Sequence, residues 1–190
     1  MAFDPTTLPA DLPVPVDDGA AAHLTGARVP DIALPATSGD RVRLAGLAGR
    51  TIVYAYPRTG RPGVELVQGW DLIPGARGCT PQSCGFRDHF AELRALGASH
   101  VFGLSTQDTA YQTEMAERLH LPFPVLSDEA LALTEALRLP TFTVEGEVLL
   151  KRLTLVIDDG RITKVFYPVF PPDRSAAEVA AWMRDNQRPT

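Results

Sequence analysis

The stretch Gly78-Cys79-Thr80-Pro81-Gln82-Ser83-Cys84-Gly85-Phe86-Arg87-Asp88 decides how this chain of 190 residues is interpreted, because it holds both of its cysteines. Thr80 favours an N-cap, and Pro81 favours the first helical position, where its missing N–H group costs nothing. Apolar residues then recur at helical spacing and predict a helix over residues 81–96. We therefore expect Cys79 just before a helix N-terminus, where free N–H groups and aligned peptide dipoles favour a thiolate.

The composition predicts one globular domain with an extension. A hydrophobic content of 45% can bury a single substantial core. We assign residues 29–190 to that domain and residues 1–28 to a proline-rich arm, either wrapped around the domain or disordered. The net charge of −5 and the lack of a basic run argue against nucleic acid and membrane partners. The chain shows neither a bilayer-spanning apolar stretch nor a secretory signal pattern, which predicts a cytoplasmic protein.

The location expected for the protein bears on its two cysteines. In the cytoplasm, thiols are more often reduced and reactive than joined in a permanent disulfide. A bridge between Cys79 and Cys84 would also close a very short loop, which gives little stabilisation through chain entropy. Both arguments favour a redox role over a structural one.

Hydrophobic patterns along the chain predict alternating strands and helices. A β-rich strand at residues 51–56 ends at Pro57, and Asp158-Asp159-Gly160 is typical of a hairpin turn. The other expected elements are a hairpin at 32–35 and 42–44, strands at 101–105, 122–126, 153–157 and 162–167, and helices at 109–120, after Asp128, and at 175–186. This order predicts an α/β fold with a mixed central β-sheet flanked by helices, preceded by an N-terminal β-hairpin.

A long loop separates the first core strand from the cysteines. Residues 58–78 are rich in glycine and proline and contain Trp70. Structureless loops of this length are uncommon in compact domains and are often functional. Trp70 either anchors the loop to the body of the protein, which we favour, or forms part of a lid over the substrate.

The Cys-x4-Cys spacing excludes some kinds of site. Disulfide exchange of the thioredoxin type uses Cys-x-x-Cys, which is absent. A zinc site needs about four ligands, and no further cysteine is available. Five residues of helix advance about 7.5 Å and turn about 140° beyond one turn, whereas bridged cysteines need Cα atoms within about 7 Å. Cys79 and Cys84 therefore cannot form a disulfide until the start of the helix unwinds.

A pair of this kind suits a catalytic cycle. One thiolate is oxidised in the folded state, the helix start opens, and the second thiol condenses with the oxidised sulfur. The oxidised species must be a sulfenic acid, since a sulfenic acid reacts with a thiol to give a disulfide and water. Attack of the thiolate on a peroxide is its simplest source. The competing interpretation is that both cysteines are merely small buried hydrophobic residues.

The motif resembles the peroxiredoxins, specifically the bacterioferritin-comigratory or Q-type branch. That branch carries Pro-Gly-Cys-Thr-x-x-x-Cys-x-Phe-Arg-Asp after a strand that ends in Tyr-Pro, here Tyr56-Pro57. The further matches lie in the family's order within residues 32–167, and they are Gly103-Leu104-Ser105-Thr106, Pro124-Val125-Leu126-Ser127-Asp128 and Arg152-Leu153-Thr154-Leu155-Val156-Ile157-Asp158. The resemblance implies a thioredoxin-like fold for this α/β domain.

The resemblance also implies roles for individual residues. Cys79 would be the peroxidatic cysteine and Cys84 the resolving cysteine. Arg152 would pair with the peroxidatic sulfur, although read alone it is an ordinary surface arginine. A guanidinium group can stabilise a thiolate and hold a peroxide oxygen, in agreement with that role.

The chain departs from the family in one part of the motif. The usual Pro-x-x-x-Thr-x-x-Cys would place threonine at position 76 and proline at position 72, where this chain has Ala76 and Leu72. An insertion after Pro57 separates the two halves, and we expect Pro57 to keep the family's proline role. Thr59 could replace the threonine that orients the peroxide; serine or backbone groups, or simple loss of the hydroxyl, are the alternatives.

These observations predict a thiol peroxidase for hydrogen peroxide and organic hydroperoxides. Its disulfide would be recycled by a thioredoxin-like dithiol reductant, without a metal, haem or flavin, and the protein would be a monomer or weak dimer. One alternative is a redox-sensing binding protein that uses the two cysteines as a switch. Another is a general disulfide reductase, which the missing Cys-x-x-Cys disfavours.

Overall fold

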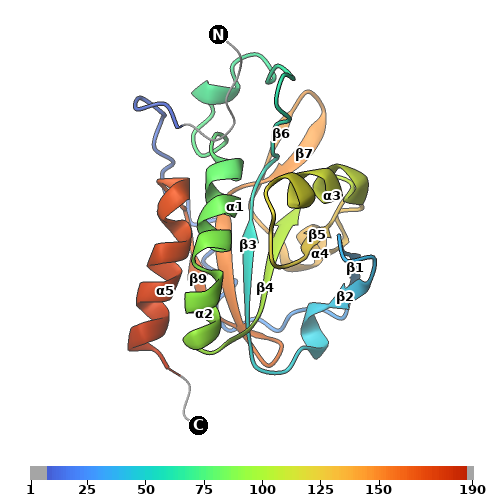
Figure 1. Ribbon diagram of the computed structural model, residues 1–190, viewed down its shortest axis with the longest axis vertical. Helices are drawn as coiled ribbons and strands as arrows, with labels where there is room; N and C mark the ends of the chain where they lie inside the picture. The colour runs from blue at the N-terminus through green and yellow to red at the C-terminus, as the bar shows by residue number, and fades with distance from the viewer. Residues whose placement is uncertain (1–7, 188–190) are drawn as a thin grey trace.

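A five-stranded mixed sheet forms the centre of the molecule, for which a computed structural model describes residues 8–187 (Figure 1). Its strands run in the order β5-β4-β3-β8-β9. Their bounds are β3 (Arg50–Ala55), β4 (Ala98–Ser105), β5 (Val125–Ser127), β8 (Leu153–Asp158) and β9 (Arg161–Phe166). β3 is parallel to β4 and antiparallel to β8. The mixed sheet predicted from the sequence is confirmed.

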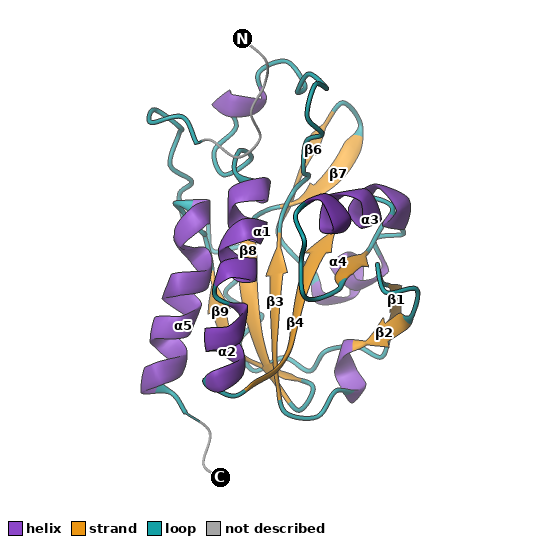
Figure 2. Ribbon diagram, viewed as in Figure 1, coloured by secondary structure: helices purple, strands orange, loops and turns teal. Residues whose placement is uncertain are grey.

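Within residues 8–187, five α-helices and three short 3₁₀ turns surround this sheet (Figure 2). The helices are α1 (Cys79–Asp88), α2 (Phe90–Ala95), α3 (Thr109–Arg118), α4 (Ala132–Leu137) and α5 (Ser175–Asp185). The 3₁₀ turns are η1 (Leu44–Gly46), η2 (Trp70–Leu72) and η3 (Pro172–Arg174). Every helix within residues 8–187 is too short or too polar to cross a lipid bilayer.

Side chains of β3 alternate between the two faces of the sheet, as a strand with a two-residue period must. Ile52 and Tyr54 pack against α1, α2, α3 and α5 in one core cluster. Val53 and Ala55 belong to a second cluster on the opposite face, together with α4, β1 and residues of the N-terminal arm. On the face of the sheet that holds the cysteines, α1 and α2 follow one another end to end, and α5 lies alongside both (Figure 1).

Two small hairpins flank the central sheet. β1 (Ala33–Pro35) pairs with β2 (Arg41–Arg43), which confirms the predicted N-terminal hairpin. β6 (Thr141–Val144) pairs with β7 (Glu147–Leu150), and this hairpin was not predicted. Its turn residues Glu145 and Gly146 both have positive φ, at 50° and 85°. A non-glycine residue in that region is uncommon, so the sequence signal for this turn is weaker than an Asp-Gly pair.

The start of α1 differs from the prediction. Thr80 is wrong as the N-cap, because α1 begins at Cys79, two residues before the predicted start at Pro81, and Gly78 occupies the cap position. A Cβ on Gly78 would lie 2.2 Å from Cγ of Pro172, and its φ is 105°. Only glycine fits both the backbone conformation and the space. The cysteine therefore lies in the first turn of the helix instead of ahead of it.

The single helix predicted over residues 81–96 is divided into α1 and α2. His89 separates them with φ −93° and ψ 2°, outside the helical range. Its ring Nδ1 lies 2.9 Å from the carbonyl oxygen of Gly85. The same oxygen also accepts from the His89 backbone N–H at 3.0 Å, so the ring and the backbone share one acceptor where the two helices meet.

The described part of the N-terminal arm, from residue 8 onward, packs against the domain. Ala21 and Leu24 are buried in the core cluster beside α4. The backbone N–H of Gly26 donates to the carbonyl oxygen of Ile162 at 2.7 Å, which ties the arm to β9. The wrapped form of the arm is thus the one this part of the chain adopts.

Candidate active site

Cys79 lies in the first turn of α1 with only 3% of its surface exposed. Its Sγ lies 3.6 Å from the carbonyl oxygen of Ala76, to which the thiol can donate. Free N–H groups at this end of the helix, together with the helix dipole, favour negative charge on the sulfur. The sequence predicted Cys79 just before the helix, and the structure places it in the first turn; its reactivity stays a prediction.

A small hollow adjoins the sulfur. It is lined partly by Arg58, Leu66 and Trp70 and has a volume of about 10 Å³. A single water needs about 10–15 Å³. This volume is at the lower limit for a single water molecule, so a larger ligand reaches the sulfur only if the loop over residues 58–78 moves.

Arg152 contacts Cys79 although it lies 73 positions later in the sequence. Its Nη2 donates to Cys79 Sγ at 3.3 Å, and the arginine is itself 3% exposed. The residue directly precedes β8, whose first residue Leu153 is paired with Ala55 at the end of β3. This register carries the guanidinium group to the N-terminus of α1. A buried cation beside a thiol stabilises the thiolate more than it stabilises the neutral form.

Backbone oxygens and one amide hold the guanidinium group in place. Nη2 also donates to the carbonyl oxygens of Gly75, Ala76 and Arg77, each at 3.2 Å. Nη1 donates to Oε1 of Gln82, a residue with no exposed surface. Residues 75–77, which precede Gly78 and Cys79, and one residue within α1 thus hold Arg152 beside the sulfur.

The redoxin family profile matches residues 24–181 of this chain. The chain belongs to the redoxin family. It is 33% identical over 147 residues to peroxiredoxin Bcp of Escherichia coli strain K12, an alignment that covers 72% of this chain and 81% of the relative. It is 30% identical over 158 residues to a chloroplastic peroxiredoxin Q of Oryza sativa subsp. japonica, covering 80% of this chain and 63% of that protein. The chain thus spans less than two thirds of the rice relative.

Solved structures of peroxiredoxins resemble this redoxin throughout the domain. The peroxidoxin BcpB of Mycobacterium tuberculosis matches with a TM-score of 0.68 at 28% identity, over 86% of this chain and 98% of that one. Peroxiredoxin Q of Xanthomonas campestris matches with a TM-score of 0.67 at 21% identity, over 94% and 99% of the two chains. The second likeness shows the fold alone. The thioredoxin-like fold and the Bcp and Q branch expected from the sequence are confirmed.

Cys84 lies in the same unbroken helix of the redoxin, five residues after Cys79, and both thiols are free. It is half-buried and packs against the helical face of the sheet. Burial raises the pKa of the Cys84 thiol above its ordinary value, and the positive charge of Arg87 opposes that rise. The thiol is therefore protonated, and a weak nucleophile, while α1 is folded.

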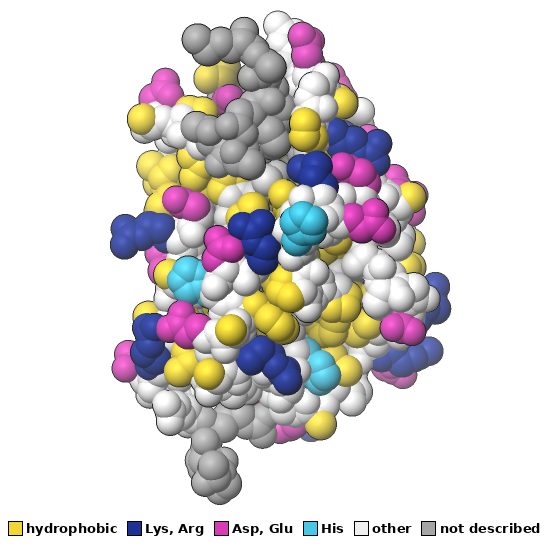
Figure 3. Space-filling model, viewed as in Figure 1, with side chains coloured by type: hydrophobic (Ala, Val, Ile, Leu, Met, Phe, Trp, Pro, Cys, Tyr) yellow, Lys and Arg dark blue, Asp and Glu magenta, His cyan; other side chains and the backbone are white. Residues whose placement is uncertain are grey.

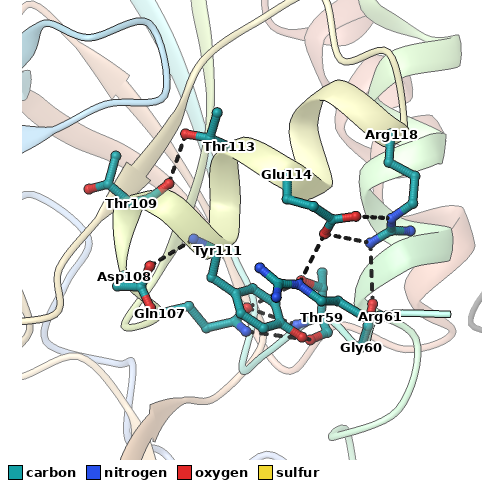
Figure 4. Close-up of polar contacts among 10 residues, drawn as sticks. All are labelled: Thr59, Gly60, Arg61, Gln107, Asp108, Thr109, Tyr111, Thr113, Glu114 and Arg118. Carbon is teal, nitrogen blue, oxygen red and sulfur yellow. Dashed lines mark hydrogen bonds and ion pairs between the residues drawn. The ribbon is translucent and has the colours of Figure 1, made fainter. Parts of the chain in front are cut away.

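Pro57 and Thr59 begin the loop that leads away from β3. The Pro57 carbonyl oxygen accepts a hydrogen bond from Ser105 Oγ at 3.0 Å. Thr59 is buried, and its hydroxyl donates to Oε1 of Gln107 at 3.3 Å (Figure 4). The Thr59 carbonyl accepts from the Tyr111 hydroxyl at 2.9 Å. Thr59 is thus held against α3, and its predicted role toward the peroxide stays a prediction.

The loop over residues 58–78 is pinned to the body at both ends. At its start, Arg61 lies over the Tyr111 ring, with the guanidinium carbon 4.1 Å from the ring centroid, and near Glu114 at 3.4 Å (Figure 4). Toward its end, Trp70 is 3% exposed and packs with Phe142 of β6 at 6.3 Å between ring centroids. Trp70 anchors the loop, and it also lines the hollow beside Cys79.

Sequence reasoning missed the groups that position Arg152. Gln82 stands three residues after Cys79 in the quoted motif, so that helical spacing could have indicated that both side chains share a face. Ala76 was treated only as a missing threonine. Its methyl group is buried with Trp70 and Leu149, while its carbonyl oxygen accepts from Arg152.

Proposed function

We propose that this redoxin is a thiol-dependent peroxidase that reduces hydrogen peroxide and organic hydroperoxides through Cys79. The observation that carries the proposal is the 3.3 Å contact between Arg152 Nη2 and Cys79 Sγ at the first residue of α1. A cation and a helix N-terminus act together on one sulfur there. This is the arrangement that activates a cysteine nucleophile.

In the first step the Cys79 thiolate attacks one oxygen of the peroxide O–O bond. An S–O bond forms, the O–O bond breaks, and the leaving oxygen takes a proton to become water or an alcohol. Cys79 is oxidised to the sulfenic acid while the peroxide is reduced. Arg152 can hold a peroxide oxygen while it supports the thiolate, and the carbonyls of residues 75–77 keep the guanidinium in position. In this proposal Pro57 shapes the site and Thr59 orients the peroxide when the loop moves.

In the second step Cys84 resolves the sulfenic acid. The thiol sulfur attacks the oxidised sulfur, a disulfide forms, and the hydroxyl group leaves as water. In a continuous helix, two cysteines that are five positions apart cannot bring their sulfur atoms together. The first turn of α1 must therefore open before the disulfide forms. Helix ends open at low cost, and opening relieves the burial that keeps the Cys84 thiol protonated.

In the third step a thioredoxin-like dithiol reductant restores both thiols by exchange. One reductant thiolate attacks the Cys79–Cys84 disulfide, and the second displaces the resulting mixed disulfide, so that the reductant leaves oxidised. The scheme uses no metal, haem or flavin. We place the enzyme in the cytoplasm as a monomer or weak dimer, and two free thiols suit a reducing compartment.

The charge distribution supports a small-molecule substrate over a nucleic acid. The chain carries a net charge of −5. On the face seen in Figure 3, basic and acidic side chains are interspersed without a basic stripe. Nucleic-acid surfaces gather lysine and arginine on one face.

The proposal is tested by peroxide consumption coupled to thioredoxin and its reductase. Wild type should turn over continuously, and Cys79→Ser should lose all activity. Cys84→Ser should complete a single turnover and then stall as the sulfenic or sulfinic acid. Peroxide loss at the wild-type rate in Cys79→Ser would contradict the proposal. A switch protein, the alternative function, would oxidise once and show no sustained turnover.

A further inference from the structure

The N-terminal arm lies directly on the segment that precedes Cys79. A Cβ on Gly78 would lie 2.9 Å from Cδ2 of Leu8, and a Cβ on Gly75 would lie 3.6 Å from Cβ and Cγ of Pro15. Both glycines have positive φ, at 105° and 78°. Two arm side chains therefore lie on this turn: Leu8 occupies space that a side chain at position 78 would need, and Pro15 is in van der Waals contact at position 75.

This same turn supplies the acceptors that hold Arg152. The carbonyl oxygens of residues 75–77 each lie 3.2 Å from Arg152 Nη2, which in turn lies 3.3 Å from Cys79 Sγ. A displacement of the turn would move the guanidinium group relative to the sulfur. The packing of the arm thus bears on the geometry of the reacting pair.

Asp18 fastens the arm at this place. Its carboxylate accepts from Lys151 Nζ at 2.6 Å and from the Tyr167 hydroxyl at 2.7 Å. Lys151 is the residue directly before Arg152. The hydrogen bond from Lys151, followed by that from Tyr167, holds the pKa of Asp18 well below its usual range. The carboxylate is therefore charged, and the fastening is intact, at neutral pH.

We propose that Asp18 is a positioning residue for the peroxide reaction. By fastening the arm through Lys151 and Tyr167, it keeps the turn over residues 75–78 in the form that aligns Arg152 with Cys79. Asp18 touches neither the substrate nor the reacting sulfur, so it acts only through this chain of contacts. The inference rests on the proposed function, because it concerns the rate of that reaction.

The chain offers a matched control in the adjacent residue. Asp17 carries the same charge, and its carboxylate accepts from the Gly19 N–H at 2.9 Å within a local turn. The test measures the second-order rate constant for oxidation of Cys79 by hydrogen peroxide in Asp18→Ala and Asp17→Ala. We expect a decrease of about 3- to 10-fold in Asp18→Ala and less than about twofold in Asp17→Ala. Asp18→Glu should recover most of the rate, because it restores a carboxylate.

Further measurements separate positioning from general stability. The thermal unfolding midpoint should be only slightly lower for Asp18→Ala than for Asp17→Ala, because an exposed ion pair contributes little to the free energy of unfolding. Removal of residues 1–15 deletes Leu8 and Pro15 but keeps Asp18, and it should slow the reaction similarly. Equal rate constants in the two alanine variants would overturn the proposal. So would a parallel loss of rate and stability that Asp18→Glu fails to restore.

Hydrogen–deuterium exchange tests the inference without peroxide chemistry. Amides in the peptide covering residues 75–82 should exchange at least about three times faster in Asp18→Ala than in Asp17→Ala. Equal exchange would overturn the positioning role. If this difference is found while wild type fails to consume peroxide, the arm contact stands and the proposed function fails.

Discussion

Arg152 Nη2 lies 3.3 Å from Cys79 Sγ, although 73 positions separate the two residues in the sequence. The contact depends on two features of the fold. β8 runs antiparallel to β3, so that Arg152, which directly precedes β8, lies beside the C-terminal end of β3. Gly78 caps α1 and places Cys79 in its first turn, next to Arg152. The predictions below test what this pair does and what supports it.

Arg152→Lys should slow the reaction of Cys79 with hydrogen peroxide by about 10- to 100-fold, because lysine keeps the charge but loses the fork that bonds the turn, Gln82 and the sulfur together. Stopped-flow kinetics with hydrogen peroxide measures the rate constant. Arg138→Lys at an exposed position serves as the control and should react as wild type. An unchanged rate in Arg152→Lys would remove the arginine from the mechanism.

Gln82→Leu should lower the free energy of unfolding by about 1–3 kcal/mol, because it leaves the buried Nη1 of Arg152 without its acceptor. Gln82→Glu retains an acceptor oxygen and should recover part of the loss. Urea unfolding of the reduced proteins measures both effects. Equal stability of Gln82→Leu and wild type would show that the amide is not needed to hold the guanidinium.

Trp70→Ala should destabilise the protein by about 3–5 kcal/mol, because it empties a packed position between the loop and β6. It should also open the hollow beside Cys79 and speed alkylation of that thiol by iodoacetamide. Leu72→Ala is the matched control, since Leu72 belongs to the same turn and is 80% exposed. Similar alkylation rates in the two variants would mean that Trp70 does not limit access.

The disulfide-forming step should accelerate as the pH rises above the ordinary thiol pKa of 9.0, because burial raises the pKa of Cys84 in folded α1. The unfolded segment loses this proton at lower pH than the folded helix. The contribution of the protonated Cys84 thiol to the stability of folded α1 is therefore complete below the pKa of the unfolded segment. It is lost as the pH rises through the higher pKa of the folded helix. Alkaline conditions thus favour both the opening of α1 and the attacking thiolate.

Stopped-flow measurement of that step between about pH 7 and about pH 10 tests this dependence. Arg87→Gln removes the charge that favours the Cys84 thiolate and should move the acceleration to higher pH. A rate that stays constant across this range would contradict the role given to burial of Cys84.

Much of the fold could be predicted because its signals are local. The apolar run before Pro57 predicts a buried strand, and Asp159-Gly160 predicts the hairpin between β8 and β9. The hairpin of β6 and β7 was missed because its turn uses Glu145, which gives no such signal. The helix start was misplaced by two residues, since the lack of space that demands glycine at position 78 comes from distant Pro172.

The positions of the two cysteines and of Arg152 could be predicted, whereas the groups that hold Arg152 could not. The spacing of Cys79 and Cys84 indicated a cycle, and the resemblance to a family supplied Arg152. Backbone carbonyl oxygens of residues 75–77 accept from Arg152, and every residue has such an oxygen. Their role therefore could not be predicted from the residue types and is seen only in the folded structure. The same is true of the contact between the arm and this turn, which joins segments far apart in the sequence.

Mass spectrometry after one equivalent of hydrogen peroxide tests the central claim most directly. The reduced protein should lose two hydrogen atoms, and digestion after arginine should yield one peptide, residues 78–87, that holds both cysteines in an internal disulfide. In Cys84→Ser the same treatment should add one oxygen atom to Cys79. Unmodified cysteines, or oxidation that leaves Cys79 unchanged, would contradict the account.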